Sequence, residues 1–98
     1  MAEFLFHLEL PHGDKQLKEE VPGQEDHINQ LFEQGRVRSY SMAAGRTMLW
    51  CVVEADTEQE AMDIVSKFPV YPFCVDVVHH TLMLHQDKPY ALPDISLN

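Results

Sequence analysis

The stretch Phe68–Val78, with the sequence FPVYPFCVDVV, decides the fold. A helix must end before Pro69, because proline lacks the amide donor and restricts the backbone of the residue before it. Pro72 then predicts an extended elbow, and an apolar run rich in β-branched residues begins directly after it. The stretch therefore predicts a helix that leads into a strand through a short Pro-aromatic-Pro connection.

The residues on either side of this connection complete the C-terminal half. Thr57–Glu60 reads TEQE, a capping box in which Thr57 can accept an amide bond and Glu60 can reach back. The buried stripe expected for the helix that follows consists of Ala61, Ile64, Val65 and Phe68. A last strand is predicted over Phe73–Leu84, followed by an irregular tail at 86–98.

The N-terminal half begins with a strand over Glu3–Leu10, whose apolar residues recur with a period of two until Pro11. Residues 14–21 are charged and fit either a loop or a short helical turn. A helix is predicted from about 22 to 34, with Pro22 at its first position and Gly35 as its C-terminal stop.

Two strands with a turn between them follow. Arg36–Met42 and Thr47–Ala55 are predicted to form a hairpin around the turn at 43–46. The order β-α-β-β-α-β predicts an α+β fold of the ferredoxin-like kind, a single domain over 1–98 whose two helices pack on one face of a four-stranded antiparallel sheet.

The other face of that sheet is expected to carry large side chains, namely Leu5, Tyr40 and Trp50. An uncovered apolar sheet face is typical of an association surface. The sequence therefore favours a homodimer in which two sheets pack face to face, a dimeric α+β barrel. The alternative is an ordinary half-exposed sheet with scattered apolar residues.

Composition excludes several partners. The 98 residues include 16 Asp and Glu against 7 Lys and Arg, a formal net charge of −9, which disfavours nucleic acid and anionic lipid. No apolar run approaches the ~20 residues of a membrane span, and residues 1–10 lack the features of a signal peptide. We expect a cytoplasmic protein that does not bind membranes, with Cys51 and Cys74 as free thiols.

His7 is the first candidate for chemistry. It lies in mid-strand on the face opposite Phe6 and Leu8, with Glu9 next along the same face. An imidazole between two packed sheets can carry a proton, because histidine titrates near neutral pH. The alternative is a hydrogen-bonded interface histidine without a chemical role.

Arg38, Tyr40 and Trp50 on the hairpin form a second candidate group. A cation, a phenol and an indole beside a cavity suit the recognition of a small carboxylate. The alternative is a solvent-facing arginine with two packed aromatic side chains.

A metal site is not expected. His79, His80 and His85 are close in sequence, but consecutive strand residues point to opposite faces and cannot share one ion. Cys51 and Cys74 are predicted on strands separated by another strand, too far apart for a disulfide. We expect no metal and no cofactor.

Several of these features together resemble the muconolactone δ-isomerase family. They are Phe4–Leu8, Gly35 followed by Val37 and Arg38, Ala44 with Gly45, and Phe68–Phe73. The resemblance implies a ferredoxin-like subunit, face-to-face dimers that build larger rings, and a pocket beside the sheet. It also implies a cofactor-independent proton shift in a small unsaturated lactone or organic acid of aromatic catabolism.

On this resemblance, the catalytic residues expected in this chain are His7 as proton carrier and Tyr40 as donor. The substrate-binding residues expected are Arg38, Trp50, Glu9, Asp76 and His80. The chain departs from the family at Ser41-Met42, where the family has Trp-Arg, and the match of the last strand is ambiguous by one residue, between Val75 and Asp76. Two other functions stay open: a non-catalytic oligomeric protein that binds small molecules, and a cofactor-free monooxygenase.

Overall fold

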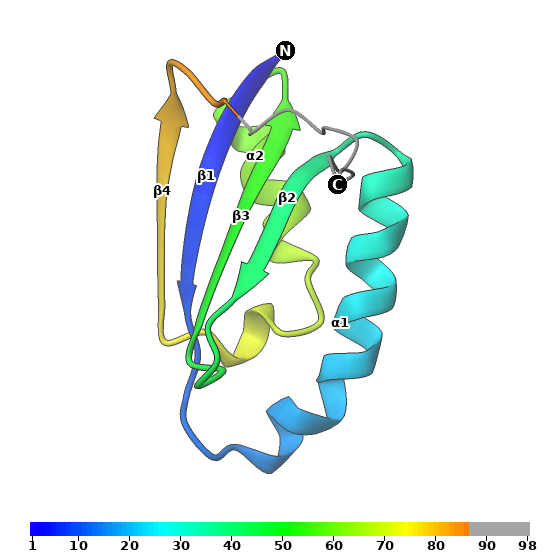
Figure 1. Cartoon of the computed structure of the whole chain (residues 1–98), viewed down its shortest axis with the longest axis vertical. Coiled ribbons are helices and arrows are strands. Elements are labelled where there is room, and N and C mark those ends of the chain that lie inside the picture. Colours follow the sequence, from blue (N-terminus) through cyan, green and yellow to red (C-terminus); the bar gives the residue numbers. More distant parts are fainter. Residues whose placement is uncertain (87–98) are drawn as a thin grey trace, which may run out of the picture.

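Helices and sheet form two layers in the computed structural model, which describes residues 1–86 (Figure 1). The elements are β1 (Ala2–Glu9), α1 (Lys15–Glu33), β2 (Val37–Met42), β3 (Met48–Ala55), α2 (Glu58–Ser66), the 3-10 turn η1 (Tyr71–Phe73) and β4 (Asp76–Leu82). The predicted order and the ferredoxin-like α+β class are confirmed. From residue 87 on, the predicted tail lies outside the described residues, and a single domain over the whole chain stays a prediction.

The sheet is antiparallel with the order β2-β3-β1-β4, so β1 is a central strand. Alternate β1 residues Phe4, Phe6 and Leu8 are buried, as the period of two predicts. They pack with Leu17, Ile28 and Leu31 of α1 and with Ala61, Ile64 and Val65 of α2 in one core. Both helices therefore cover the same face of the sheet, and no helix of residues 1–86 covers the other face.

The first helix begins seven residues earlier than the sequence predicts. Asp14 is its N-cap, and its side chain accepts a hydrogen bond from the amide of Leu17 at 3.1 Å. Pro22 consequently lies inside α1 rather than at its start. The charged segment 14–21 is helical because Leu17 packs into the core, a tertiary contact that outweighs the local proline signal.

The predicted end of α1 at Gly35 is confirmed. Gly35 adopts a φ of 71°, a left-handed conformation that glycine takes without steric cost. The amide of Gly35 donates to the Phe32 carbonyl at 3.0 Å and that of Arg36 to the Leu31 carbonyl at 2.9 Å. These two bonds are the Schellman motif, which satisfies carbonyls at the helix end.

The connection between α2 and β4 is partly as predicted. The Thr57 hydroxyl caps α2 by accepting from the Glu60 amide at 3.1 Å, and the helix ends before Pro69. The expected extended elbow is wrong, because Tyr71–Phe73 forms a 3-10 turn and β4 begins only at Asp76. The buried side chain of Gln24 in α1 accepts a hydrogen bond from the Val70 amide at 3.3 Å, which ties this connection to the helix.

The second strand contains a bulge that changes the direction of its side chains. Val37 pairs with Val53, whereas Ser39 pairs with the adjacent Val52, so one extra residue of β2 is inserted between them. Val37 and Tyr40 therefore face the helices, whereas Arg38 and Ser39 face the open side. A regular strand would have kept Arg38 and Tyr40 on one face.

Replacing Pro22 by Ala should stabilise the protein. Alanine restores an amide donor within α1 and removes the clash of the proline ring with the preceding turn, so the free energy of unfolding should rise by about 1–3 kcal/mol. Urea unfolding at pH 7 measures this change. The matched control is Gly23→Ala, whose Cβ would meet nothing within 4 Å and which should gain about 0.5–1 kcal/mol. A Pro22→Ala variant no more stable than the wild type would contradict an uninterrupted α1.

Candidate functional site

The side of the sheet that faces away from both helices, called here the open face, carries alternate residues of β1, β3 and β4. They are Glu3, Leu5, His7 and Glu9 of β1, Met48, Trp50, Val52 and Glu54 of β3, and Asp76, Val78, His80 and Leu82 of β4. Apolar side chains occupy the middle of this face, and carboxylates lie toward both ends. The prediction that Leu5 and Trp50 lie on this face is confirmed.

His7 lies near the middle of the open face. Its ring stacks on the Trp50 indole, with a centroid distance of 5.4 Å and an angle of 14° between the planes. On the other side it pairs with Val78 of β4. Its Nε2 is buried and has no hydrogen-bond partner among residues 1–86, so this nitrogen keeps an unused capacity for a hydrogen bond within the described part of the chain.

Two carboxylates lie beside this histidine. Glu9 and Asp76 are directly opposite one another on β1 and β4, one pair further along the open face than His7. Together with Met48 and Val78 they line a hollow of about 20 Å³ around the imidazole, called here the His7 hollow. Like charges directly opposite one another across a sheet lower the stability of the fold. Packing of the core therefore does not account for this pair of carboxylates.

The register of the last strand is now defined. Asp76 faces the open side, whereas Val75 precedes β4 and donates its amide to the Glu9 carbonyl at 2.8 Å. His79 and His80 lie on opposite faces, as the alternation predicts. His79 lies beside the Phe6 ring on the helix side, whereas exposed His80 lies opposite Leu5, diagonal to His7.

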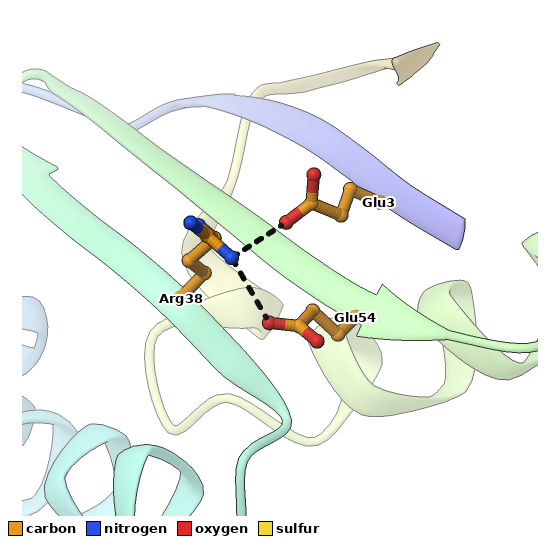
Figure 2. Close-up of polar contacts among 3 residues, drawn as sticks. All are labelled: Glu3, Arg38 and Glu54. Atoms are coloured by element: carbon orange, nitrogen blue, oxygen red, sulfur yellow. Dashed lines mark ion pairs between the residues drawn. The ribbon is translucent and has the colours of Figure 1, made fainter. Parts of the chain in front are cut away.

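Arg38 lies away from His7. Its guanidinium is 3.3 Å from a carboxylate oxygen of Glu3 and 3.8 Å from one of Glu54, at the other end of the open face (Figure 2). Glu3 is four residues from His7 along β1, roughly 13 Å. Arg38 therefore pairs with carboxylates toward the end of the open face that lies away from the His7 hollow, and its role in substrate binding stays a prediction.

Tyr40 also differs from the expectation, because it faces the helices and not the open face. It pairs with buried Cys51 on β3. Burial raises the pKa of the Tyr40 phenol, and the side chain of Gln24 opposes part of that rise. The phenol is therefore neutral at pH 7, and the sheet separates it from His7, so Tyr40 and His7 of one chain cannot act on the same bound molecule.

The two cysteines are free thiols. Burial raises the pKa of Cys51 to about 12 and that of Cys74 to about 11. Both are therefore protonated at neutral pH, and neither has the thiolate character of a nucleophile. Across residues 1–86, no three His, Cys, Asp or Glu side chains come close enough together to hold a metal ion.

A larger pocket that the sequence did not predict lies on the helix side of the sheet. It has a volume of about 240 Å³ and lies between the start of α1 and the β2–β3 turn. Its lining comes from the segment 10–21, from Met42 to Arg46 and from Val70. No spacing within one segment could have indicated this pocket, because three separate parts of the chain form it.

No protein-family model matches the sequence, and no curated protein matches it significantly. Solved structures do match. Muconolactone isomerase superposes with a TM-score of 0.65 and 17% identity, over 93% of this chain and 97% of that one. A 5-chloro-2-hydroxyhydroquinone dehydrochlorinase from Burkholderia phenoliruptrix AC1100 was solved in complex with 2,5-dihydroxybenzoquinone. It superposes with a TM-score of 0.59 and 16% identity, over 80% of this chain and 90% of that one.

A third match is MtbAldR, with a TM-score of 0.57 and 13% identity over 92% of this chain and 58% of that chain. Identities this low establish a shared fold and nothing finer. The resemblance to muconolactone isomerase is thus confirmed as a likeness of fold.

Within the described part of the chain, no helix has the length and apolar character needed to cross a membrane.

Replacing Asp76 by Asn should stabilise the protein at pH 7. The change removes the like-charge contact with Glu9 and should raise the free energy of unfolding by about 0.2–1 kcal/mol. The gain should shrink in 1 M salt, where exposed charges are screened within ~3 Å. Asp26→Asn on the exposed side of α1 is the control, because it changes the net charge equally. Equal stability of the two variants in urea unfolding would contradict a local repulsion at the hollow.

Proposed function

We propose that this protein is a cofactor-independent enzyme that moves a proton within a small unsaturated lactone, with His7 as the proton carrier. The observation that supports this most is the His7 imidazole, whose buried Nε2 has no hydrogen-bond partner among residues 1–86. This imidazole stacks on the Trp50 indole and lines a hollow together with the carboxylates of Glu9 and Asp76. The fold similarity to muconolactone isomerase is consistent with it.

The chemistry needs one group that removes a proton and returns it to another carbon. In the proposed reaction, the Nε2 lone pair of His7 takes a proton from the carbon next to the lactone carbonyl, and the C–H electrons form a dienolate. The imidazolium then returns the proton at the far end of the conjugated system, so the lactone is isomerised without gain or loss of atoms. Glu9 and Asp76 stabilise the imidazolium while it exists.

The charges favour a neutral lactone over an anionic substrate. Glu9 and Asp76 line the hollow, and Arg38 is engaged with Glu3 and Glu54 at the far end of the face. A substrate carboxylate placed beside two carboxylates would be repelled, whereas a neutral ring meets the Trp50 indole and the Val78 side chain. The roles expected of Tyr40 and Arg38 as donors are therefore not part of this proposal within one chain.

The proposed site is completed by a second copy of the chain. The His7 hollow, at about 20 Å³, holds about one water molecule, which is too little for a lactone. A second sheet packed face to face would supply the missing wall and cover the apolar residues Leu5, Trp50, Val78 and Leu82. A subunit of this size buries only about 60–65% of its unfolded surface, so association would also add stability. Higher rings stay a prediction from the resemblance.

Replacing His7 by Gln should greatly slow isomerisation. We expect α-angelica lactone, a neutral β,γ-unsaturated probe, to be converted to its conjugated isomer, and His7→Gln to lower the rate by about 10²–10⁴-fold. The assay follows ultraviolet absorbance, with deuterium uptake from D₂O measured by NMR. His27→Gln is the control, because that imidazole packs against Phe68 on the helix side.

The outcomes separate the three functional classes. Equal turnover by wild type and His7→Gln would overturn the role of His7. Binding that raises Tm without turnover would identify a non-catalytic binding protein. Oxygen consumption with a hydroquinone, together with an inert lactone, would identify a monooxygenase.

Replacing Val78 by Glu should dissociate the proposed dimer. Val78 is 39% exposed in the single chain, so the subunit can still fold, but the change places a new carboxylate on each of the two facing sheets. We expect sedimentation equilibrium to show a dimer for the wild type at micromolar concentration and at least a hundredfold weaker association for the variant. Phe32→Glu on α1, where the side chain is 42% exposed, should leave the dimer intact. Single chains for the wild type would refute the face-to-face arrangement.

A further inference from the structure

We propose that the pocket between α1 and the β2–β3 turn binds a small apolar molecule that carries one carboxylate. This α1–turn pocket lies on the helix side of the sheet. The start of α1 and the β2–β3 turn, which line it, lie at the same end of the sheet (Figure 1). It is separate from the His7 hollow, which opens on the other side of the sheet. The inference therefore does not depend on the proposed isomerase activity.

The wall of the pocket is mainly apolar. The apolar residues that line it are Leu10, Leu17, Val21, Met42 and Val70. Two of these, Leu10 and Val70, are buried core residues outside α1, so this part of the wall exists before a ligand arrives. A volume of about 240 Å³ suits a single ring or a short chain, because sites for larger ligands occupy about 300–1,000 Å³.

Two cations line the same pocket. Lys18 is one turn into α1, and Arg46 is in the β2–β3 turn, so the two reach the pocket from opposite sides. His12 is a further polar residue of the lining. The remaining charged residue there is Asp14, whose carboxylate already accepts the Leu17 amide as the helix cap. In a chain of net charge −9, an apolar cavity with two cations favours an anion that carries a hydrocarbon body.

The backbone at Arg46 is the independent observation. Arg46 has a φ of 62°, and it is the one residue other than glycine with a positive φ in the described part of the chain. A left-handed conformation is unfavourable for a residue with a Cβ, a cost that glycine would avoid. Such strain is found most often at functional sites, and here it places a guanidinium at the mouth of an apolar pocket.

A carboxylate explains the combination better than a phosphate does. The guanidinium of Arg46 can hold both oxygens of a carboxylate, and the ring or chain attached to it can lie against Met42 and Val70. Inorganic phosphate would meet the cations but would leave the apolar wall unused and would lie near Asp14. The structure thus favours an aromatic or short aliphatic monocarboxylate.

Benzoate is the probe, with benzamide as its neutral isostere. The full chain is labelled at methionine methyl groups, because Met42 lines the α1–turn pocket and Met48 lines the His7 hollow. We expect benzoate to shift the Met42 signal and not that of Met48, and benzamide to bind at least tenfold more weakly. Inorganic phosphate at equal ionic strength should leave Met42 unchanged.

Arg46→Asn tests the residue directly. Asparagine tolerates the left-handed backbone, so the turn should be kept while the cation is lost. Benzoate affinity should fall at least tenfold, and the preference for benzoate over benzamide should disappear. Arg36→Asn, the same change of charge at a different groove, should bind benzoate like the wild type.

Three results would overturn the proposal: equal binding of benzoate and benzamide, a Met42 response to phosphate, or no Met42 response at millimolar benzoate. A response at Met48 alone would also overturn it. That last result would place the ligand in the His7 hollow and would leave the proposed enzymatic function standing.

Discussion

The alternation of side chains along β1 is the constraint on which the rest of the structure depends. Because β1 is one of the two inner strands, its buried residues Phe4, Phe6 and Leu8 pack in the core with both helices. The residues that alternate with them face away from the helices. A shift of one residue in register would bring His7 into the core and a phenylalanine to the open face. The period of two in one strand therefore determines both where the core lies and where an imidazole can meet a ligand.

The connection between α2 and β4 links that core to the pocket. Val70 is fully buried, donates its amide to Gln24 of α1 and lines the α1–turn pocket. Gln24 is the only buried polar residue among the described residues, and its hydrogen bond satisfies an amide that would otherwise be buried without a partner. The position of the pocket wall is thus fixed by a contact between segments 46 residues apart.

Local signals predicted the parts of the fold that local interactions determine. The capping box at Thr57, the stop at Gly35 and the alternation of β1 each depend on residues within one element, and each was predicted correctly. The predicted start of α1 was wrong because Pro22 is a strong local signal, whereas the observed start depends on the packing of Leu17 in the core.

The candidate site was predicted in part, for the same reason. His7, Trp50, Glu9 and Asp76 share one face, since the strand period places them there. Tyr40 was misplaced because a single extra residue at the bulge reverses the side chains after it, and a bulge has no distinct mark in this sequence. The α1–turn pocket could not be predicted, because its wall combines three segments whose contact depends on the whole fold.

The proline inside α1 has a consequence for how a ligand reaches that pocket. Without an amide at Pro22, the turns before it are joined to the rest of the helix by fewer hydrogen bonds. In the described structure, Leu17 and Val21 are the residues of segment 15–21 that are not exposed. A segment held so weakly unfolds locally far more often than the whole domain does. Transient fraying of residues 15–21 would thus uncover the cavity, and a guest seated inside would in turn hold those turns closed.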